Sequence, residues 1–414
     1  MSAPNLVPPQ SSALLASQEQ QSFGTYFSAA IKRIRGGDIG SLPIILGFVM
    51  IAIIFQSQNS NFLTPRNIVQ LILQMAGIAA IAYGVVFVLL LGEIDLSAGY
   101  VSAVAGVSVA VLLRPPYELP WFIAMAIAFA AMLAIGALHG WITTYFRLPS
   151  FVVTLAGSLA WSGVVLGIVG RGGTVIIGDP IVRGLSLSFF PPLVGWIICI
   201  VLIALFAFTQ LRTYSTRRAN GLATKPIGFI AIETGILSIM AIGIVYICNQ
   251  DRGLPFIGVL LLALLIVLSY IAGQTRLGRY IYAIGGNKEA ARRAGVRVEA
   301  IRIIVFMISS VMAGVGGIIL ASRLGSVSAE AGGGDLLLNS IAAAVIGGTS
   351  LFGGRGLVSS AILGALIIAS IDNGLGLIPG FPSSIKFIIT GLVLLAAVII
   401  DSISRRSQQR SGLR

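Results

Sequence analysis

The sequence predicts an all-α, polytopic membrane protein with about 10–12 transmembrane helices. Of its 414 residues, 57% are hydrophobic and only 10% are charged, and the mean hydropathy is +0.98. Soluble domains carry about 25% charged residues. Apolar runs of about 18 or more residues recur, which is the length needed to cross a hydrocarbon layer of about 30 Å. Because these runs do not alternate apolar with polar residues, a β-barrel is excluded.

Twelve apolar runs organise the chain between two polar tails. Residues 1–38 are rich in Ser and Gln and predict a flexible tail, residues 39–402 form the membrane domain, and residues 403–414 form a basic tail. The runs lie at 39–55, 67–91, 96–113, 121–142, 151–169, 189–210, 226–247, 254–273, 301–320, 338–352, 357–375 and 385–400. The runs at 96–113 and 338–352 are short, so they are candidates for re-entrant half-helices.

The basic residues predict how the chain is oriented. When the runs alternate from a cytoplasmic N-terminus, 20 of the 27 Lys and Arg residues face the cytoplasm, ten of them in the linker 210–225 and the loop 274–300. The seven others are Arg66, Arg114, Arg171, Arg183, Arg252, Arg323 and Lys386. This bias follows the positive-inside rule and places both termini in the cytoplasm. It also explains the net charge of +13 without a nucleic-acid partner.

The residues of catalysis and metal binding are scarce. Cys199 and Cys248 are isolated in apolar runs, and His139 is the single histidine, so we expect two packing residues and a satisfied interfacial histidine. Metal sites and intramembrane enzymes need clustered ligands or a nucleophile with its base. The sequence therefore predicts no catalytic residue, no metal and no cofactor in this chain.

Two polar breaks interrupt the apolar runs. "GEIDLSAG" (92–99) contains Glu93 and Asp95, and an acidic residue at this depth costs about 2.5–3.5 kcal/mol on insertion scales. "GGTSLFGGRG" (347–356) contains five glycines and Arg355. It lacks the Lys and Ser/Thr of a phosphate-binding loop. Both breaks predict broken or re-entrant segments that are enclosed by protein or line a cavity.

The two breaks are also candidates for a two-fold internal repeat. Each is followed later by a similar opening, "RLPSFVVTLAG" (147–157) after the first and "GFPSSIKFIITG" (380–391) after the second. Related halves are common in transporters. Chance similarity between Gly-rich membrane segments explains the pattern equally well.

A small charged island, "AIGGNKEAARRAGV" (283–296), separates two apolar runs. Gly285 and Gly286 predict a turn, Asn287 an N-cap, Lys288–Ala294 a two-turn helix and Gly295 its stop. A helix this short is not stable alone. It either lies against lipid headgroups or docks through its small residues into a groove on another protein.

The island and the breaks together resemble a known family. "GRYIYAIGGNKEAARRAGV" (278–296), "LNSIAAAVIGGTSLFGGRG" (338–356), "ASIDNGLGL" (369–377), "GEIDLSAG" and "LPSFVVTLAG" (148–157) occur in the order found in permease subunits of bacterial sugar ABC importers of the ribose/xylose/arabinose type. The resemblance covers about residues 60–402. The chain exceeds ribose-type permeases around residues 189–250, and it looks most like the xylose-permease branch.

This resemblance implies an inner-membrane permease that imports a monosaccharide, with xylose or a related pentose as the substrate. Its partners would be a second permease copy, giving a homodimer, a cytoplasmic ATPase subunit that binds the ATP, and a periplasmic sugar-binding protein. The island would be the coupling segment that enters a cleft of the ATPase. By resemblance, its contact residues are Gly278, Arg279, Ala283, Gly285, Gly286, Asn287, Ala290, Ala291, Ala294 and Gly295.

A sugar path needs hydroxyl and amide partners with few fixed charges. Asp95, Ser97, Asn339 and Asn373 are the candidates, although Asp95 and Asn373 could instead pair with backbone or neighbouring helices. A rival hypothesis is a secondary transporter driven by an ion gradient, with Glu93 and Asp95 as its titrating site. That hypothesis gives the charged island no role.

Overall fold

A computed structural model describes residues 42–399, except for positions 171, 172, 223, 381, 383, 386, 394, 397 and 398. The predicted tails 1–38 and 403–414 lie outside the described residues, as does part of the last predicted span. The described chain forms two compact units. Residues Pro191–Gly253 make up one, called here the hairpin unit, and residues 42–190 with 254–399 make up the other, called the main unit.

The hairpin unit consists of α9 (Pro192–Ala219) and α10 (Ile227–Asn249), which pack against each other. A proline precedes the first turn of each helix. Lys225 forms an ion pair with Glu233 at 2.8 Å, and Gln210 donates a hydrogen bond to the same carboxylate at 3.1 Å. Because α9 extends to Ala219, most of the predicted linker 210–225 belongs to the last turns of this helix. This unit coincides with the stretch around residues 189–250 where the chain is expected to exceed ribose-type permeases.

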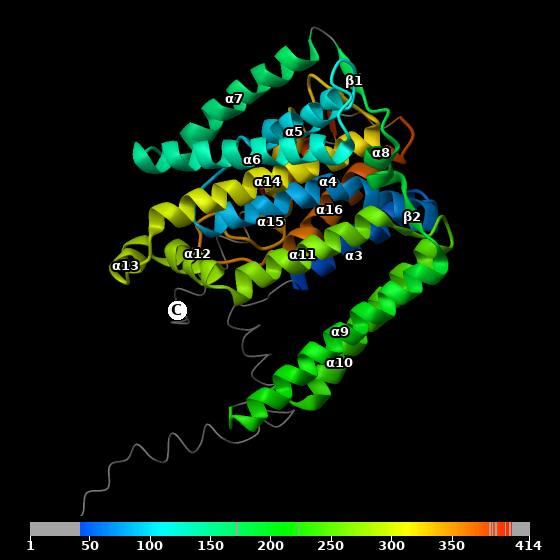
Figure 1. Cartoon of the computed structure of the whole chain (residues 1–414). Coiled ribbons are helices and arrows are strands. Elements are labelled where there is room, and N and C mark those ends of the chain that lie inside the picture. Colours follow the sequence, from blue (N-terminus) through cyan, green and yellow to red (C-terminus); the bar gives the residue numbers. More distant parts are fainter. Residues whose placement is uncertain are drawn as a thin grey trace, which may run out of the picture. The chain divides into compact units, whose positions relative to one another are not determined.

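The main unit holds most of the helices (Figure 1). They are α3 (Leu42–Gln58), α4 (Pro65–Leu90), α5 (Ala98–Leu112), α6 (Trp121–Tyr145), α7 (Ser150–Val169), α8 (Pro180–Leu187), α11 (Phe256–Gln274), α12 (Arg276–Gly286), α13 (Lys288–Arg293), α14 (Val298–Leu324), α15 (Asp335–Ile346) and α16 (Ser360–Gly376). Two short antiparallel β-ribbons form between segments that connect the helices. β1 (Thr174–Ile176) pairs with β4 (Ser326–Ser328), and β2 (Phe189–Phe190) pairs with β3 (Leu254–Pro255).

The core of the main unit forms around α4 and α14. α14 packs against α4, α5 and α6, while α15 and α16 cover another part of α4. Small residues let these backbones approach closely, as is usual between membrane helices. A Cβ at Gly317 of α14, for example, would overlap the carbonyl group of Ser102 on α5. α12 and α13 lie at the opposite end of the long helices from β1 and α8 (Figure 1).

The helix lengths confirm the predicted class. Within the described part of the chain, seven helices are long and apolar enough to cross a membrane, and four shorter apolar helices accompany them. α15 has 12 residues, or about 18 Å at 1.5 Å per residue, so it cannot cross about 30 Å of hydrocarbon alone. The chain is broken after α4 and after α15, at the two predicted places. The internal repeat stays a prediction, since its second opening lies partly outside the described residues.

Candidate functional site

The two polar breaks meet inside the main unit. The first break joins α4 to α5 and the second joins α15 to α16. The amide of Gly354 in the second break donates a hydrogen bond to the carbonyl oxygen of Leu90, at the end of α4, over 2.9 Å. A Cβ at Gly353 would lie only 2.9 Å from the amide nitrogen of Gly92. The breaks are therefore in direct backbone contact, although about 260 residues separate them along the chain.

The C-terminal end of α12 packs against this same junction. A Cβ at Gly285 would overlap the carbonyl oxygen of Leu90 and would lie 2.5 Å from the amide nitrogen of Gly354. One turn earlier, the Tyr282 hydroxyl donates to the carbonyl oxygen of Gly356 over 2.7 Å. One helix end thus contacts both broken segments. We call Leu90, Gly92, Gly285, Gly353 and Gly354 the glycine junction.

The charged island forms the helix that its sequence predicts, with one correction. The Asn287 side chain caps α13 by accepting from the amide of Ala290 at 2.9 Å, and Gly295 ends the segment with a φ of +83°. The predicted turn at Gly285 and Gly286 is wrong, because both residues belong to the last turn of α12. The missing Cβ of Gly285 serves close packing against the glycine junction, and the chain changes direction at Asn287 instead.

The ten residues assigned to the coupling segment divide into two groups. Gly278 and Ala291 are buried, and Gly285 packs into the glycine junction, so these three contact the chain itself. The other seven are exposed on α12, α13 and the residues next to them: Arg279, Ala283, Gly286, Asn287, Ala290, Ala294 and Gly295. The exposed group is the surface available to a partner.

Asp95 lies in the first break and is almost fully buried, with 3% of its surface exposed. One carboxylate oxygen accepts from the backbone amide of Ser97 at 2.9 Å and from its hydroxyl at 2.6 Å. The other accepts from the hydroxyl of Ser309 on α14 at 2.8 Å. Asp95 therefore ties the first break to α14, and both of its oxygens are occupied.

This network continues to two residues that sequence reasoning did not place there. The Trp161 indole N–H donates to His139 Nε2 over 3.1 Å, and His139 Nδ1 lies 3.3 Å from the Ser97 hydroxyl. Since Nε2 accepts, a neutral His139 carries its proton on Nδ1 and donates to Ser97, which donates to Asp95. His139 is satisfied, as expected, and it is buried in the protein.

Two hydroxyl groups of α7 accept hydrogen bonds from backbone amides of the first break. The amide of Ile94 donates to Ser150 Oγ at 3.1 Å, and the amide of Leu96 donates to Thr154 Oγ1 at 3.0 Å. These two acceptors are four residues apart, so they lie on one face of α7. They satisfy backbone amides that have no helical partner, which is the condition for non-helical chain at membrane depth. These hydrogen bonds give Ser150 and Thr154 of "LPSFVVTLAG" a structural role.

The remaining acidic residue and the two asparagines occupy other surroundings. Glu93 forms an ion pair with Arg302 of α14. Asn373 on α16 accepts at Oδ1 from the side-chain amide of Asn67 on α4, at 2.8 Å. Asn339 on α15 is buried, and its Oδ1 has no hydrogen-bond partner among the described residues. Of the four sugar-path candidates, the structure joins Asp95 with Ser97, while the asparagines belong to different elements.

Comparison with known proteins decides the family. A family model described as "Branched-chain amino acid transport system / permease component" matches residues 67–398, which is most of the chain. The chain belongs to this permease family. The permease is therefore a multi-pass membrane protein of a transport system, and the predicted fold class is confirmed.

Xylose and ribose permeases are among the relatives of the permease, which confirms the predicted recognition. The chain is 37% identical to the xylose transport system permease protein of Escherichia coli (strain K12) over 366 residues, which cover 87% of this chain and 92% of the relative. The corresponding xylose protein of Haemophilus influenzae is 33% identical over 371 residues, or 88% and 95%. The ribose import permease protein of Escherichia coli (strain K12) is 32% identical over 359 residues, or 87% and 92%. No solved structure matches the chain.

These relatives give no support to the gradient-driven alternative, and neither does the site. Both carboxylates on which it depends are engaged, Glu93 with Arg302 and Asp95 with two serines.

Proposed function

We propose that the permease is the membrane subunit of an ATP-binding-cassette importer that carries a pentose, xylose in the first place, across the bacterial inner membrane. The observation that carries this proposal is the 37% identity to a xylose transport permease over 87% of the chain. The ribose import permease is also similar, at 32%, which supports a pentose as the substrate class. The chain itself makes and breaks no covalent bond.

The coupling surface consists of the seven exposed residues of α12, α13 and their flanks. A separate ATPase subunit holds these residues in a cleft and supplies the energy. When the ATPase moves α12, the glycine junction transmits the displacement to both breaks, because Gly285 and Tyr282 contact them directly. Differential binding of nucleotide to the two conformations of the complex drives the change between outward-open and inward-open states.

The permease works as a homodimer that is supplied by a periplasmic sugar-binding protein. Its α12–α13 end faces the cytoplasm, together with both chain termini. Two observations support this orientation: the basic residues gather on the predicted inner side, and α12 and α13 lie at the opposite end of the long helices from β1 and α8.

The ATPase contact can be tested by co-purification in mild detergent. The double variant Gly286→Arg, Ala290→Glu changes two exposed positions of the coupling surface and should lose more than about 90% of the bound ATPase, because a buried unpaired charge costs several kcal/mol. The control is Gly178→Arg, which adds the same cation at an exposed position near β1 with open space around it. If both variants lose the ATPase equally, or if the native chain never retains one, the importer assignment fails. Uptake of labelled xylose and ribose by the reconstituted complex then identifies the sugar.

Asn373 can be tested separately as a residue of the sugar path. Asn373→Ala and Asn67→Ala both break the hydrogen bond between these side chains, and Asn67→Ala also removes the bond that its amide donates to the carbonyl oxygen of Phe62. Asn373→Ala should therefore lower the free energy of unfolding by about 1 kcal/mol and Asn67→Ala by about 2 kcal/mol. If Asn373 also binds sugar, only Asn373→Ala should raise the KM for uptake, by about tenfold. An unchanged KM in Asn373→Ala, with the folded protein less stable as expected, would remove Asn373 from the path.

A further inference from the structure

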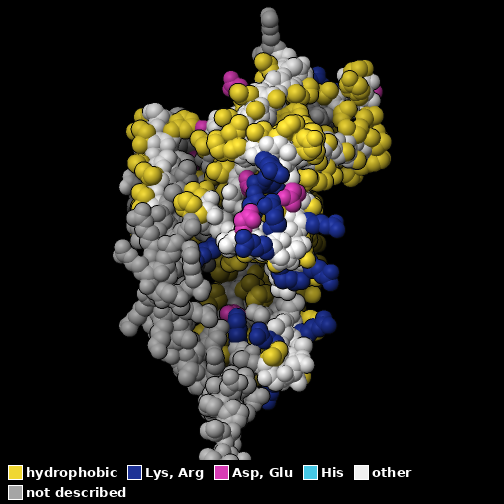
Figure 2. Space-filling model, turned by 90° about the vertical axis from the view of Figure 1, so that its left-hand side faces the viewer, with side chains coloured by type: hydrophobic (Ala, Val, Ile, Leu, Met, Phe, Trp, Pro, Cys, Tyr) yellow, Lys and Arg dark blue, Asp and Glu magenta, His cyan; other side chains and the backbone are white. Residues whose placement is uncertain are grey.

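A charged cavity of about 660 Å³ lies beside the coupling helix α13. Its walls come from the turn between α6 and α7, from α13 and from the first turns of α14. Figure 2 shows Lys and Arg side chains gathered, with Asp and Glu among them, on the face that carries α12 and α13. Arg147, Arg302, Lys288 and Arg292 are the cations of the wall, and Glu289 and Glu299 are its carboxylates.

The acidic residues neutralise only part of this positive charge. Arg292 binds both wall carboxylates, Glu289 at 3.1 Å and Glu299 at 2.7 Å, and Arg302 pairs with Glu93. Neither Arg147 nor Lys288 forms an ion pair with any residue that the structure describes, although Lys288 lies near Glu299. Four cations and two carboxylates leave the wall with an excess of two positive charges, which Glu93 behind Arg302 reduces to one.

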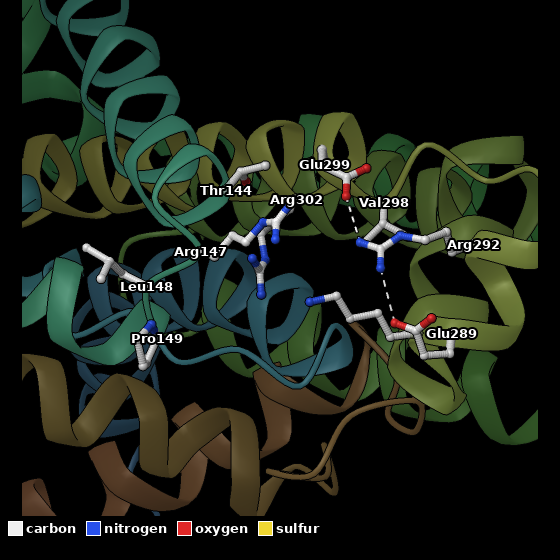
Figure 3. Close-up of a pocket in the computed structure, with 10 residues that line it drawn as sticks. Thr144, Arg147, Leu148, Pro149, Glu289, Arg292, Val298, Glu299 and Arg302 are labelled. Atoms are coloured by element: carbon white, nitrogen blue, oxygen red, sulfur yellow. Dashed lines mark hydrogen bonds and ion pairs between the residues drawn. The ribbon is translucent and has the colours of Figure 1, made fainter.

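The geometry concentrates this excess at one place. Arg147 and Arg302 both line the cavity, and Figure 3 shows their side chains directed into it. Arg147 takes a φ of +54° in the tight turn before Pro149, a conformation that a residue with a side chain rarely adopts. Arg302 pairs with Glu93, so the positive charge that has no ion-pair partner among the described residues lies on Arg147 and Lys288. The cavity volume is within the range of small-molecule sites, about 300–1,000 Å³.

We propose that this cavity is a binding site for a phosphate group, held by Arg147 and Lys288 with Arg302 beside them. A phosphate monoester carries a charge of about −1.5 to −2 at pH 7, so it can pair with both cations of the wall that lack an ion-pair partner in the described part of the chain, Arg147 and Lys288. Guanidinium groups bind phosphate oxygens in a bidentate manner, and the ammonium group of Lys288 supplies a mobile third cation. The group comes from a soluble phosphate ester or from an anionic lipid headgroup.

The position of the site gives it a regulatory role. A bound phosphate connects Lys288 on the coupling helix α13 to Arg302, and Arg302 holds Glu93 of the first break. Occupancy therefore fastens α13 to the membrane helices and changes how easily the coupling surface moves. This role rests on the proposed function, whereas the binding does not.

Binding can be measured on the purified full-length chain with three probes: inorganic phosphate, ribose 5-phosphate, and nanodiscs of phosphatidylglycerol compared with phosphatidylcholine. The native chain should bind at least one of the anions, and Arg147→Gln and Lys288→Gln should each weaken binding by about tenfold or more. Arg276→Gln is the matched control, because it removes an exposed cation of α12 outside the cavity. Lys288 is exposed, so its variant keeps the test valid even if the Arg147 variant unfolds.

If the native chain binds the soluble probes saturably and the cavity variants do not, the source is a phosphate ester. If the native chain prefers phosphatidylglycerol nanodiscs and the same variants lose this preference, the source of the phosphate group is a lipid headgroup. The proposal is overturned if no probe binds, or if the cavity variants bind as well as Arg276→Gln does. It is also overturned if the cavity variants change only the retention of the ATPase, since the cavity would then receive an acidic side chain of that partner.

Discussion

Gly285→Ala should disable the permease, although it adds a single methyl group. The new Cβ overlaps the carbonyl oxygen of Leu90 and approaches the amide of Gly354, and neither backbone group can rotate away as a side chain would. Overpacking of this kind costs about 3 kcal/mol. We expect a clear fall in the melting temperature and sugar uptake below about a tenth of the native rate, because α12 is displaced from both breaks.

The neighbouring glycine provides the control. Gly286 belongs to the same helical turn, but a Cβ there meets nothing within 4 Å, so Gly286→Ala should keep the native melting temperature. Thermal unfolding in detergent and uptake in proteoliposomes test both variants. If the two substitutions have the same effect on stability, close packing at the glycine junction is not what holds α12 in place.

Asp95→Ala should be the most destabilising substitution in the first break. It removes the acceptor of three hydrogen bonds and leaves the buried hydroxyls of Ser97 and Ser309 without their partner. Hydrogen bonds to a charged group contribute about 1.5–3 kcal/mol each, so the free energy of unfolding should fall by about 4 kcal/mol or more. Much of the variant should aggregate on extraction.

Two further variants separate structure from transport. Ser309→Ala removes one of the three hydrogen bonds and should cost about 1.5–3 kcal/mol. Asp95→Asn keeps an acceptor for Ser97 and should fall between the other two. This order of melting temperatures tests the network. If Asp95→Ala instead remains as stable as Ser309→Ala but transports no sugar, Asp95 acts on the substrate or on the gate.

The sequence was sufficient to predict where the membrane helices break. Charged and glycine-rich residues within apolar runs carry a free-energy cost that only special surroundings relieve, so Glu93, Asp95 and the glycines of 347–356 marked the breaks. Local chemistry also predicted the cap at Asn287, because an N-cap depends on residues within one helical turn.

The sequence did not predict which helices meet. Ser309, His139 and Trp161 come from α14, α6 and α7, and nothing in their spacing relates them to Asp95. In a membrane helix that is apolar on every side, the pattern does not distinguish a face that contacts protein from one that contacts lipid. α4 and α7 have similar hydropathy, yet α4 is almost wholly buried and α7 mostly uncovered. The glycine junction could not be predicted either, because it depends on which helices meet. From the sequence alone, Gly285 predicts a local turn and not close packing against another segment.

The enclosure of α4 also constrains the order in which this protein can assemble. α4 is made early, but the helices that cover it, α14, α15 and α16, come from the last third of the chain. During synthesis α4 must therefore remain in the bilayer with lipid along the faces that protein later covers. Its strongly apolar sequence is compatible with lipid during synthesis as well as with the protein core after folding. If translation stopped before residue 298, α14, α15 and α16 would be absent and α4 would be free to associate with other apolar helices in the membrane.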